Sequence, residues 1–97
     1  MYEIIRTKKA DRDLEAIADY IAKDNPYKAL SFVQEMLDNF HNIFAMFPLA
    51  SIKYEKYHCH TYKNYLLFYK VNKEKKIIHI MHIVHSAQYT VYNNFSK

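Results

Sequence analysis

The side chains in this sequence that could bind a metal or transfer a proton are its six histidines and its single cysteine. Three of the histidines, His79, His82 and His85, follow one another at intervals of three residues. That spacing gathers ligands on one face of a helix, but in an extended strand His82 points away from His79 and His85. The surrounding residues favour a strand, so we expect no metal site there.

A second group of such side chains is the run His58-Cys59-His60. In an extended segment the two histidines share a face, but no third ligand is evident, and Cys59 has no evident base that would make it a nucleophile. With one cysteine the chain can form no internal disulfide, which agrees with a reducing compartment. Glycine is absent, so a glycine-rich phosphate-binding loop is excluded, and we expect no cofactor.

The formal charge is distributed unevenly along the chain. Residues 1–50 contain six Lys or Arg and eight Asp or Glu, a formal charge of −2. Residues 51–97 contain eight Lys or Arg and two Asp or Glu, a formal charge of +6, so the total is +4. The basic half also holds most of the histidines and tyrosines. A basic sheet face with Tyr and His interleaved is what a nucleic acid or another phosphate-rich partner selects, although a solvated surface has the same composition.

Two apolar runs carry these histidines and tyrosines. They are NYLLFYKV from Asn64 and IIHIMHIVH up to His85, and the polar residues NKEKK separate them. This pattern predicts two paired antiparallel strands, the first of them central in a sheet. Strict alternation along the second strand puts His82 on one face with Ile78, Ile80 and Val84, and puts His79 and His85 on the other with Ile77, Met81 and Ile83.

Two amphipathic helices precede these strands. Apolar residues at helical spacing predict one helix from its cap Thr7 to about Lys23, with Asp13 among the polar residues off the apolar stripe. Asn25 predicts the cap of a second helix that ends before Pro48. The short break between the helices makes them an antiparallel hairpin, whose apolar stripes must pack against the strands.

The remaining segments complete an α+β fold. Tyr2–Arg6 is a short opening strand, Ser51–Tyr62 alternates like an edge strand or an ordered loop, and the tail after His85 is expected to be irregular. The sequence thus predicts a single domain over residues 1–97, with an N-terminal strand, an antiparallel helix hairpin and a three-stranded antiparallel meander, and with the helices packed on one face of the sheet. No apolar run is long enough for a membrane helix and no signal-peptide pattern is evident, so we expect a cytoplasmic protein without a membrane partner.

In this order and with these residues, the chain resembles the toxins of the RelE/ParE superfamily of bacterial type II toxin–antitoxin systems. The matching pieces are DLEAIADYI with the NP break that follows it, MFPLA at the end of the second helix, NYLLFYKV, and the closing IIHIMHIVHSAQY. Together they cover nearly the whole chain. The resemblance implies a small toxin that is neutralised by an antitoxin encoded beside it, whose helical or extended segment wraps the toxin.

Members of this superfamily divide by target. RelE-like and YoeB-like toxins are ribosome-dependent endoribonucleases that cut mRNA, whereas ParE-like toxins inhibit DNA gyrase. The nuclease branch usually carries an Arg after the Tyr of the third-strand motif and further Arg residues after the last strand, where this chain has Leu66, Ser86 and Gln88. The long helix hairpin is more typical of the ParE-like branch.

Cleaving RNA without a metal requires a base for the 2′-hydroxyl proton, an acid for the leaving oxygen and fixed positive charge beside the phosphorus. The resemblance implies that His85, at the end of the last strand, occupies the place of the catalytic His of YoeB-like members. The other candidates are Glu55, which could hold the imidazole, Tyr89 or Tyr92 as an acid or a stacking platform, and Lys53, Lys56 and Lys63 as RNA-binding cations. His85 could equally be a strand-end residue without chemistry.

Three functions therefore remain open at this point. The first, slightly favoured by His85 and the basic, Tyr-rich half, is a toxin that inhibits translation by cutting mRNA on the ribosome. The second is a non-catalytic inhibitor of DNA gyrase, and the third is an inactive module that only binds an antitoxin. All three require a cognate antitoxin as partner, and only the first requires the ribosome and mRNA.

Overall fold

Two helix caps set the N-terminal half of the fold. In the computed structural model, which describes residues 1–54 and 56–87, Thr7 begins α1 (Lys8–Asp24) by accepting a hydrogen bond from the Ala10 amide. Asn25 ends α1 by donating its amide to the Ile21 carbonyl, and it begins α2 (Pro26–Phe44) through its side chain. Both caps are as the sequence predicted. The second helix ends at Phe44 and does not continue up to Pro48, because the chain turns at residues 45–46.

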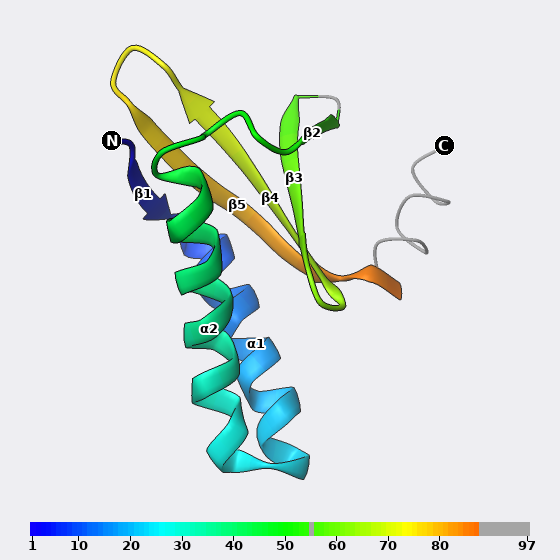
Figure 1. Ribbon diagram of the computed structural model, residues 1–97. Coiled ribbons are helices and arrows are strands. Elements are labelled where there is room, and N and C mark those ends of the chain that lie inside the picture. Colours follow the sequence, from blue (N-terminus) through cyan, green and yellow to red (C-terminus); the bar gives the residue numbers. More distant parts are fainter. Residues whose placement is uncertain (55, 88–97) are drawn as a thin grey trace.

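The strands form one five-stranded sheet with the order β1-β5-β4-β3-β2 (Figure 1). Its members are β1 (Glu3–Arg6), β2 (Ile52–Tyr54), β3 (Tyr57–Tyr62), β4 (Tyr65–Asn72) and β5 (Ile77–His85). β1 pairs with β5 in parallel and all other neighbours are antiparallel. The predicted α+β architecture and the central position of β4 are confirmed, but the single segment expected over Ser51–Tyr62 is two strands that pair with each other.

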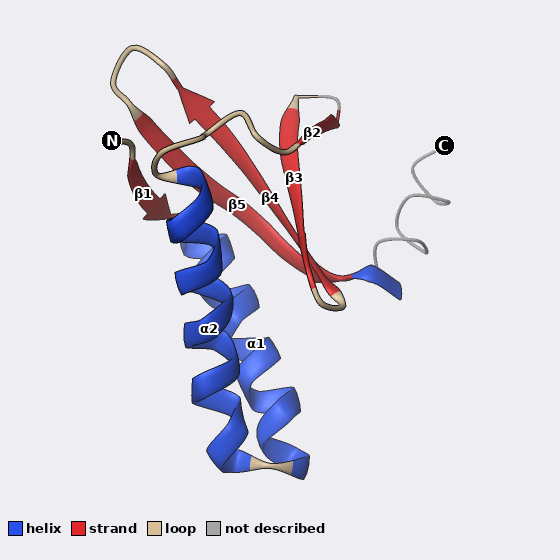
Figure 2. Ribbon diagram, in the orientation of Figure 1, coloured by secondary structure: helices blue, strands red, loops and turns tan. Residues whose placement is uncertain are grey.

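The helices lie on one face of the sheet and the core lies between them and the strands (Figure 2). The second helix, α2, contributes Met36, Phe40 and Phe44 to the core, and the sheet contributes Leu67 and Tyr69, all at most 1% exposed. Burying a side chain of this size stabilises the fold by about 1.5–3 kcal/mol. We call this side of the sheet the covered face and the other side the open face.

A β-bulge in β5 changes which residues reach each face. Leu67 pairs with Ile83 and Phe68 with His82, but the next residue, Tyr69, pairs with Ile80, so Met81 has no partner on β4. Residues directly opposite each other on neighbouring strands have their side chains on the same face of the sheet. The pairing of β5 with β4 therefore assigns each residue of β5 to one of the two faces. Ile78, Ile80, Ile83 and His85 lie on the covered face, whereas His79, His82 and Val84 lie on the open face.

The face assignment from strict alternation was therefore wrong for this strand. His82 shares the open face with His79, and His85 is separated from both. The physical reason is that one extra residue shifts the two-residue period for everything beyond it. Of the helices described, none is long and apolar enough to cross a membrane.

Candidate functional site

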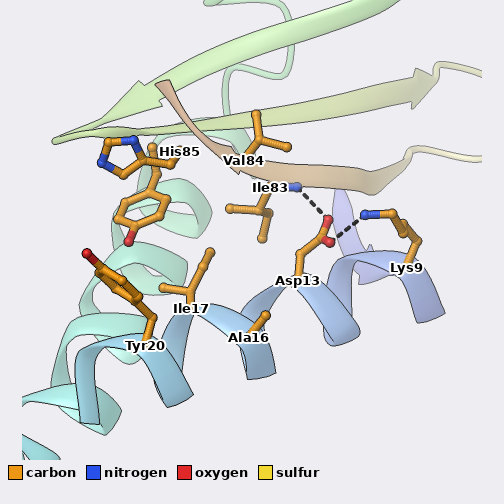
Figure 3. Close-up of a pocket in the computed structure, with 9 residues that line it drawn as sticks. Lys9, Asp13, Ala16, Ile17, Tyr20, Ile83, Val84 and His85 are labelled. Atoms are coloured by element: carbon orange, nitrogen blue, oxygen red, sulfur yellow. Dashed lines mark hydrogen bonds and ion pairs between the residues drawn. The ribbon is translucent and has the colours of Figure 1, made fainter. Parts of the chain in front are cut away.

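His85 lies at the end of β5, where that strand passes α1 (Figure 3). Its ring meets the Tyr65 ring edge-on, with ring centroids 5.3 Å apart, and its Nδ1 accepts a hydrogen bond from the Ala87 amide. That bond leaves Nε2 to carry the proton of the neutral ring. A shallow pocket of about 600 Å³ extends from His85 along α1, with Ile17 and Tyr20 on the helix side.

At the other end of this pocket Asp13 joins α1 to the sheet (Figure 3). β1 pairs only with residues 77–80 of β5, so the next part of the strand edge has no strand neighbour. The Ile83 amide at that edge donates a 2.9 Å hydrogen bond to Asp13 Oδ2, and Lys9 pairs with Oδ1. The sequence placed Asp13 among solvent-facing residues, and only its spacing of four from Lys9 signalled a fixed carboxylate.

The predicted RNA-binding lysines do not gather around His85. Lys53 on β2 pairs with His58 on β3, and His58 pairs with Tyr69 on β4. His85 on β5 pairs with a different residue of β4, Tyr65. Tyr69 is four residues from Tyr65, so Lys53 lies about 13 Å along the strands and about 14 Å across the sheet from His85. The described structure thus places this lysine too far away to share one phosphate with His85.

The other two predicted lysines lie on opposite sides of the sheet. Lys56 Nζ is 5.4 Å from the ring centroid of Tyr57, which contacts His82 on the open face. Lys63, in the turn between β3 and β4 with a φ of 52°, lies at the same end of the sheet as His85. Its Nζ is 5.4 Å from the Phe32 ring of α2. Among the three, only Lys63 thus lies at the His85 end of the sheet.

The remaining predicted site residues cannot be placed in this way. Glu55, Tyr89 and Tyr92, together with Gln88, lie outside the described residues. Their suggested roles in holding the imidazole, donating a proton or stacking on a base stay predictions.

Aromatic and basic side chains form a cluster on the open face that sequence reasoning did not single out. The Tyr57 ring contacts the rings of Phe68 and His82, with centroids 6.3 and 5.7 Å away, and the ammonium groups of Lys56 and Lys70 lie 5.4 and 5.3 Å from its own centroid. A ring platform beside two cations can stack on a base and attract its phosphate. Strict alternation hid the cluster, because it put His82 on the wrong face.

The surroundings of His82 on the open face favour its neutral form. Burial lowers the pKa of His82 first of all, and the nearby Lys9, Lys56 and Lys70 lower it further, against the opposing effect of Asp13. A neutral imidazole can accept a proton, so this lowered pKa favours the form of His82 that a general base requires.

The run His58-Cys59-His60 serves packing and hydrogen bonding. His60 Nε2 is 2.9 Å from Asn39 Oδ1, and its ring contacts Phe44 at a centroid distance of 4.9 Å. Burial lowers the pKa of both histidines and raises the pKa of the Cys59 thiol, so these groups favour their uncharged forms. Across residues 1–54 and 56–87, no group of three or more His, Cys, Asp or Glu side chains could hold a metal ion.

Comparison with known proteins gives one family match and several structural likenesses. Residues 4–89 match the model of the family described as ParE toxin of type II toxin-antitoxin system, parDE. A structure of the chromosomal ParDE toxin–antitoxin system from P. aeruginosa superposes with a TM-score of 0.72 at 24% identity, covering 88% of this chain and 96% of the other. The RelBE2 toxin–antitoxin complex from Mycobacterium tuberculosis gives a TM-score of 0.57 at 20% identity, covering 87% and 96%. No curated protein sequence matches significantly.

Proposed function

Because this chain belongs to the ParE toxin family of type II toxin–antitoxin systems, we propose that it inhibits DNA gyrase by binding it, without catalysis. The observation that carries this proposal is that two of the three predicted cations, Lys53 and Lys56, lie away from His85, so that only Lys63 is at its end of the sheet. Acid–base cleavage requires the base and the stabilising cations to reach one phosphate group at hydrogen-bond distance. Lys53 is about 13 Å along and about 14 Å across the sheet from His85, and Lys56 lies toward the opposite face.

The proposal includes a cognate antitoxin that neutralises the toxin. The solved structures of similar fold are described as toxin–antitoxin systems or complexes, which supports such a partner here. The formal charge of +4 suits an acidic antitoxin, because opposite net charges speed association and favour the complex.

A second candidate function is mRNA cleavage on the ribosome, and the open-face cluster favours it. Tyr57 with Lys56 and Lys70 offers a stacking ring and two cations, and His82, whose pKa is lowered by burial and by these lysines, contacts that ring. In this alternative His82 takes the role of general base that the sequence assigned to His85, because His82 has cations nearby.

The test is to express the chain without its antitoxin and to measure both possible targets directly. We expect DNA replication to stop with induction of the SOS response, cellular mRNA to remain intact by primer extension, and purified chain to inhibit supercoiling by purified gyrase. The variants His85→Ala and His82→Ala should leave the inhibition within about twofold of the unaltered chain, because neither histidine performs a chemical step.

The opposite result would replace this function by the nuclease. Cutting of mRNA within codons, with supercoiling unaffected, contradicts the gyrase proposal. The two histidine variants then locate the base: protection of mRNA by His82→Ala alone assigns catalysis to the open face, and protection by His85→Ala alone assigns it to the end of β5. A soluble, folded chain that affects neither replication nor mRNA would refute both functions.

A further inference from the structure

A run of apolar side chains is exposed in the connection between α2 and β2 and at the first residue of β2. Met46, Phe47, Leu49 and Ile52 are 59%, 65%, 49% and 79% exposed. Single exposed apolar residues are normal on protein surfaces, but four within seven consecutive positions form a patch of the kind that marks an interaction site. We call residues 45–52 the apolar loop; it contains no charged residue.

The apolar loop is fixed from beneath, so its side chains are not exposed by chance. The hydroxyl of Tyr69, a residue with no exposed surface, donates a 2.9 Å hydrogen bond to the Pro48 carbonyl and lies 2.6 Å from Ser51 Oγ. At the start of the loop the Tyr2 amide donates to the Ala45 carbonyl over 2.8 Å. A loop held at both ends in this way presents its apolar side chains already ordered, which lowers the entropic cost of binding.

The surroundings of the apolar loop indicate what kind of partner fits. The loop leads into β2, the last strand of the sheet, which pairs only with β3 and leaves its outer edge free in the described structure (Figure 1). Lys53 on β2 is exposed, and no Asp or Glu occurs between residues 41 and 54. A free strand edge suits an extended peptide, and an apolar surface beside the exposed Lys53 suits apolar side chains with a carboxylate placed to pair with that lysine.

We propose that the apolar loop and the outer edge of β2 bind an extended acidic segment of the antitoxin. Apolar side chains of that segment cover Met46, Phe47 and Leu49, and a carboxylate pairs with Lys53. A second copy of this chain paired edge to edge fits less well, because it would bring the Lys53 side chains of the two copies together. This inference rests on membership of the toxin–antitoxin family and is independent of whether the target is gyrase.

The test compares two equally drastic changes at two exposed apolar sites. The dissociation constant of the purified chain with its cognate antitoxin, the protein encoded beside it, is measured by calorimetry for Phe47→Asp and for Tyr27→Asp. Tyr27 is 92% exposed at the start of α2, the end of that helix remote from the apolar loop. We expect Phe47→Asp to raise the dissociation constant about 10-fold or more and Tyr27→Asp to change it less than about twofold.

A charge reversal tests the second half of the proposal. Lys53→Glu should weaken binding of the antitoxin, and the difference from the unaltered chain should shrink at high salt, because the salt screens the pairing. Unchanged urea midpoints would show that Phe47→Asp and Lys53→Glu act on binding, as expected for exposed positions.

Three results would overturn the inference. Equal effects of Phe47→Asp and Tyr27→Asp would mean that the apolar loop has no special part in binding the antitoxin. Loss of toxicity with unchanged antitoxin affinity would assign the surface to the cellular target. A purified chain that is dimeric alone and becomes monomeric on Phe47→Asp would assign it to a second copy. Because gyrase inhibition is assayed separately, failure of this inference is distinguishable from failure of the proposed function.

Discussion

Replacing Tyr69 by Phe removes one buried hydroxyl and leaves the packed ring in place. That hydroxyl donates to the Pro48 carbonyl and contacts Ser51 Oγ. Each hydrogen bond contributes about 1 kcal/mol net, and an acceptor left without a partner adds its own cost. Because the Tyr69 side chain is fully buried, we expect Tyr69→Phe to lower the free energy of unfolding by about 2 kcal/mol.

The matched control is Tyr65→Phe on the same strand and the same face. Tyr65 is 8% exposed, and its hydroxyl makes no hydrogen bond to any residue that the structure describes. Its removal should change the free energy of unfolding by less than about 0.5 kcal/mol. The pair therefore compares the same chemical change with and without the hydrogen bonds.

Equilibrium urea unfolding measures this difference. With a slope of about 2 kcal/mol per M, a loss of about 2 kcal/mol moves the unfolding midpoint of Tyr69→Phe down by about 1 M, whereas Tyr65→Phe should shift by at most about 0.25 M. Equal shifts for the two variants would refute the reasoning, because they would mean that the Tyr69 hydroxyl does not hold the apolar loop to the core.

Three further predictions follow from single contacts. Asp13→Ala leaves the Ile83 amide without its acceptor and should lower the free energy of unfolding by about 1–3 kcal/mol, whereas Asp13→Asn keeps an oxygen there and should lower it less. Urea midpoints equal to that of the unaltered chain for both variants would contradict this prediction. Asn25→Ala removes the cap of α2 and should cost about 1 kcal/mol, whereas Asn25→Ser, which retains a capping oxygen, should restore most of it. Burial lowers the pKa of His60, so below about pH 6.5 the unfolded chain binds more protons than the folded chain, and the free energy of unfolding should fall as the pH drops from about 7.5 to about 5.5. An equal fall in the His60→Gln variant would show that other groups cause it.

Local features of this fold were predictable from the sequence because their causes lie within a few residues. Thr7 and Asn25 cap their helices through contacts to amides three positions away, at Ala10 and Lys28. The apolar spacing of the two helices and the apolar runs of β4 and β5 depend only on the period of each element. The order of these elements was enough to indicate the α+β architecture and the toxin superfamily.

The candidate site was less predictable, because its members come together only in the tertiary structure. The sequence identified His85 and three lysines as types suited to chemistry, but strand order and register separate His85 from Lys53 and Lys56. The bulge at Met81 depends on how β5 pairs with β4, and it moves His82 to the open face beside Tyr57.

The sequence by itself thus determined the elements, their caps and the family of this protein, since each is encoded by local pattern. The tertiary structure alone decided the parallel pairing of β1 with β5, the faces of the histidines, the contact of Asp13 with Ile83 and the exposure of the apolar loop. Asp13 and Ile83 are 70 positions apart in the chain. No local pattern can encode such a contact, because it depends on the relative placement of whole elements, which the packing of the common core settles.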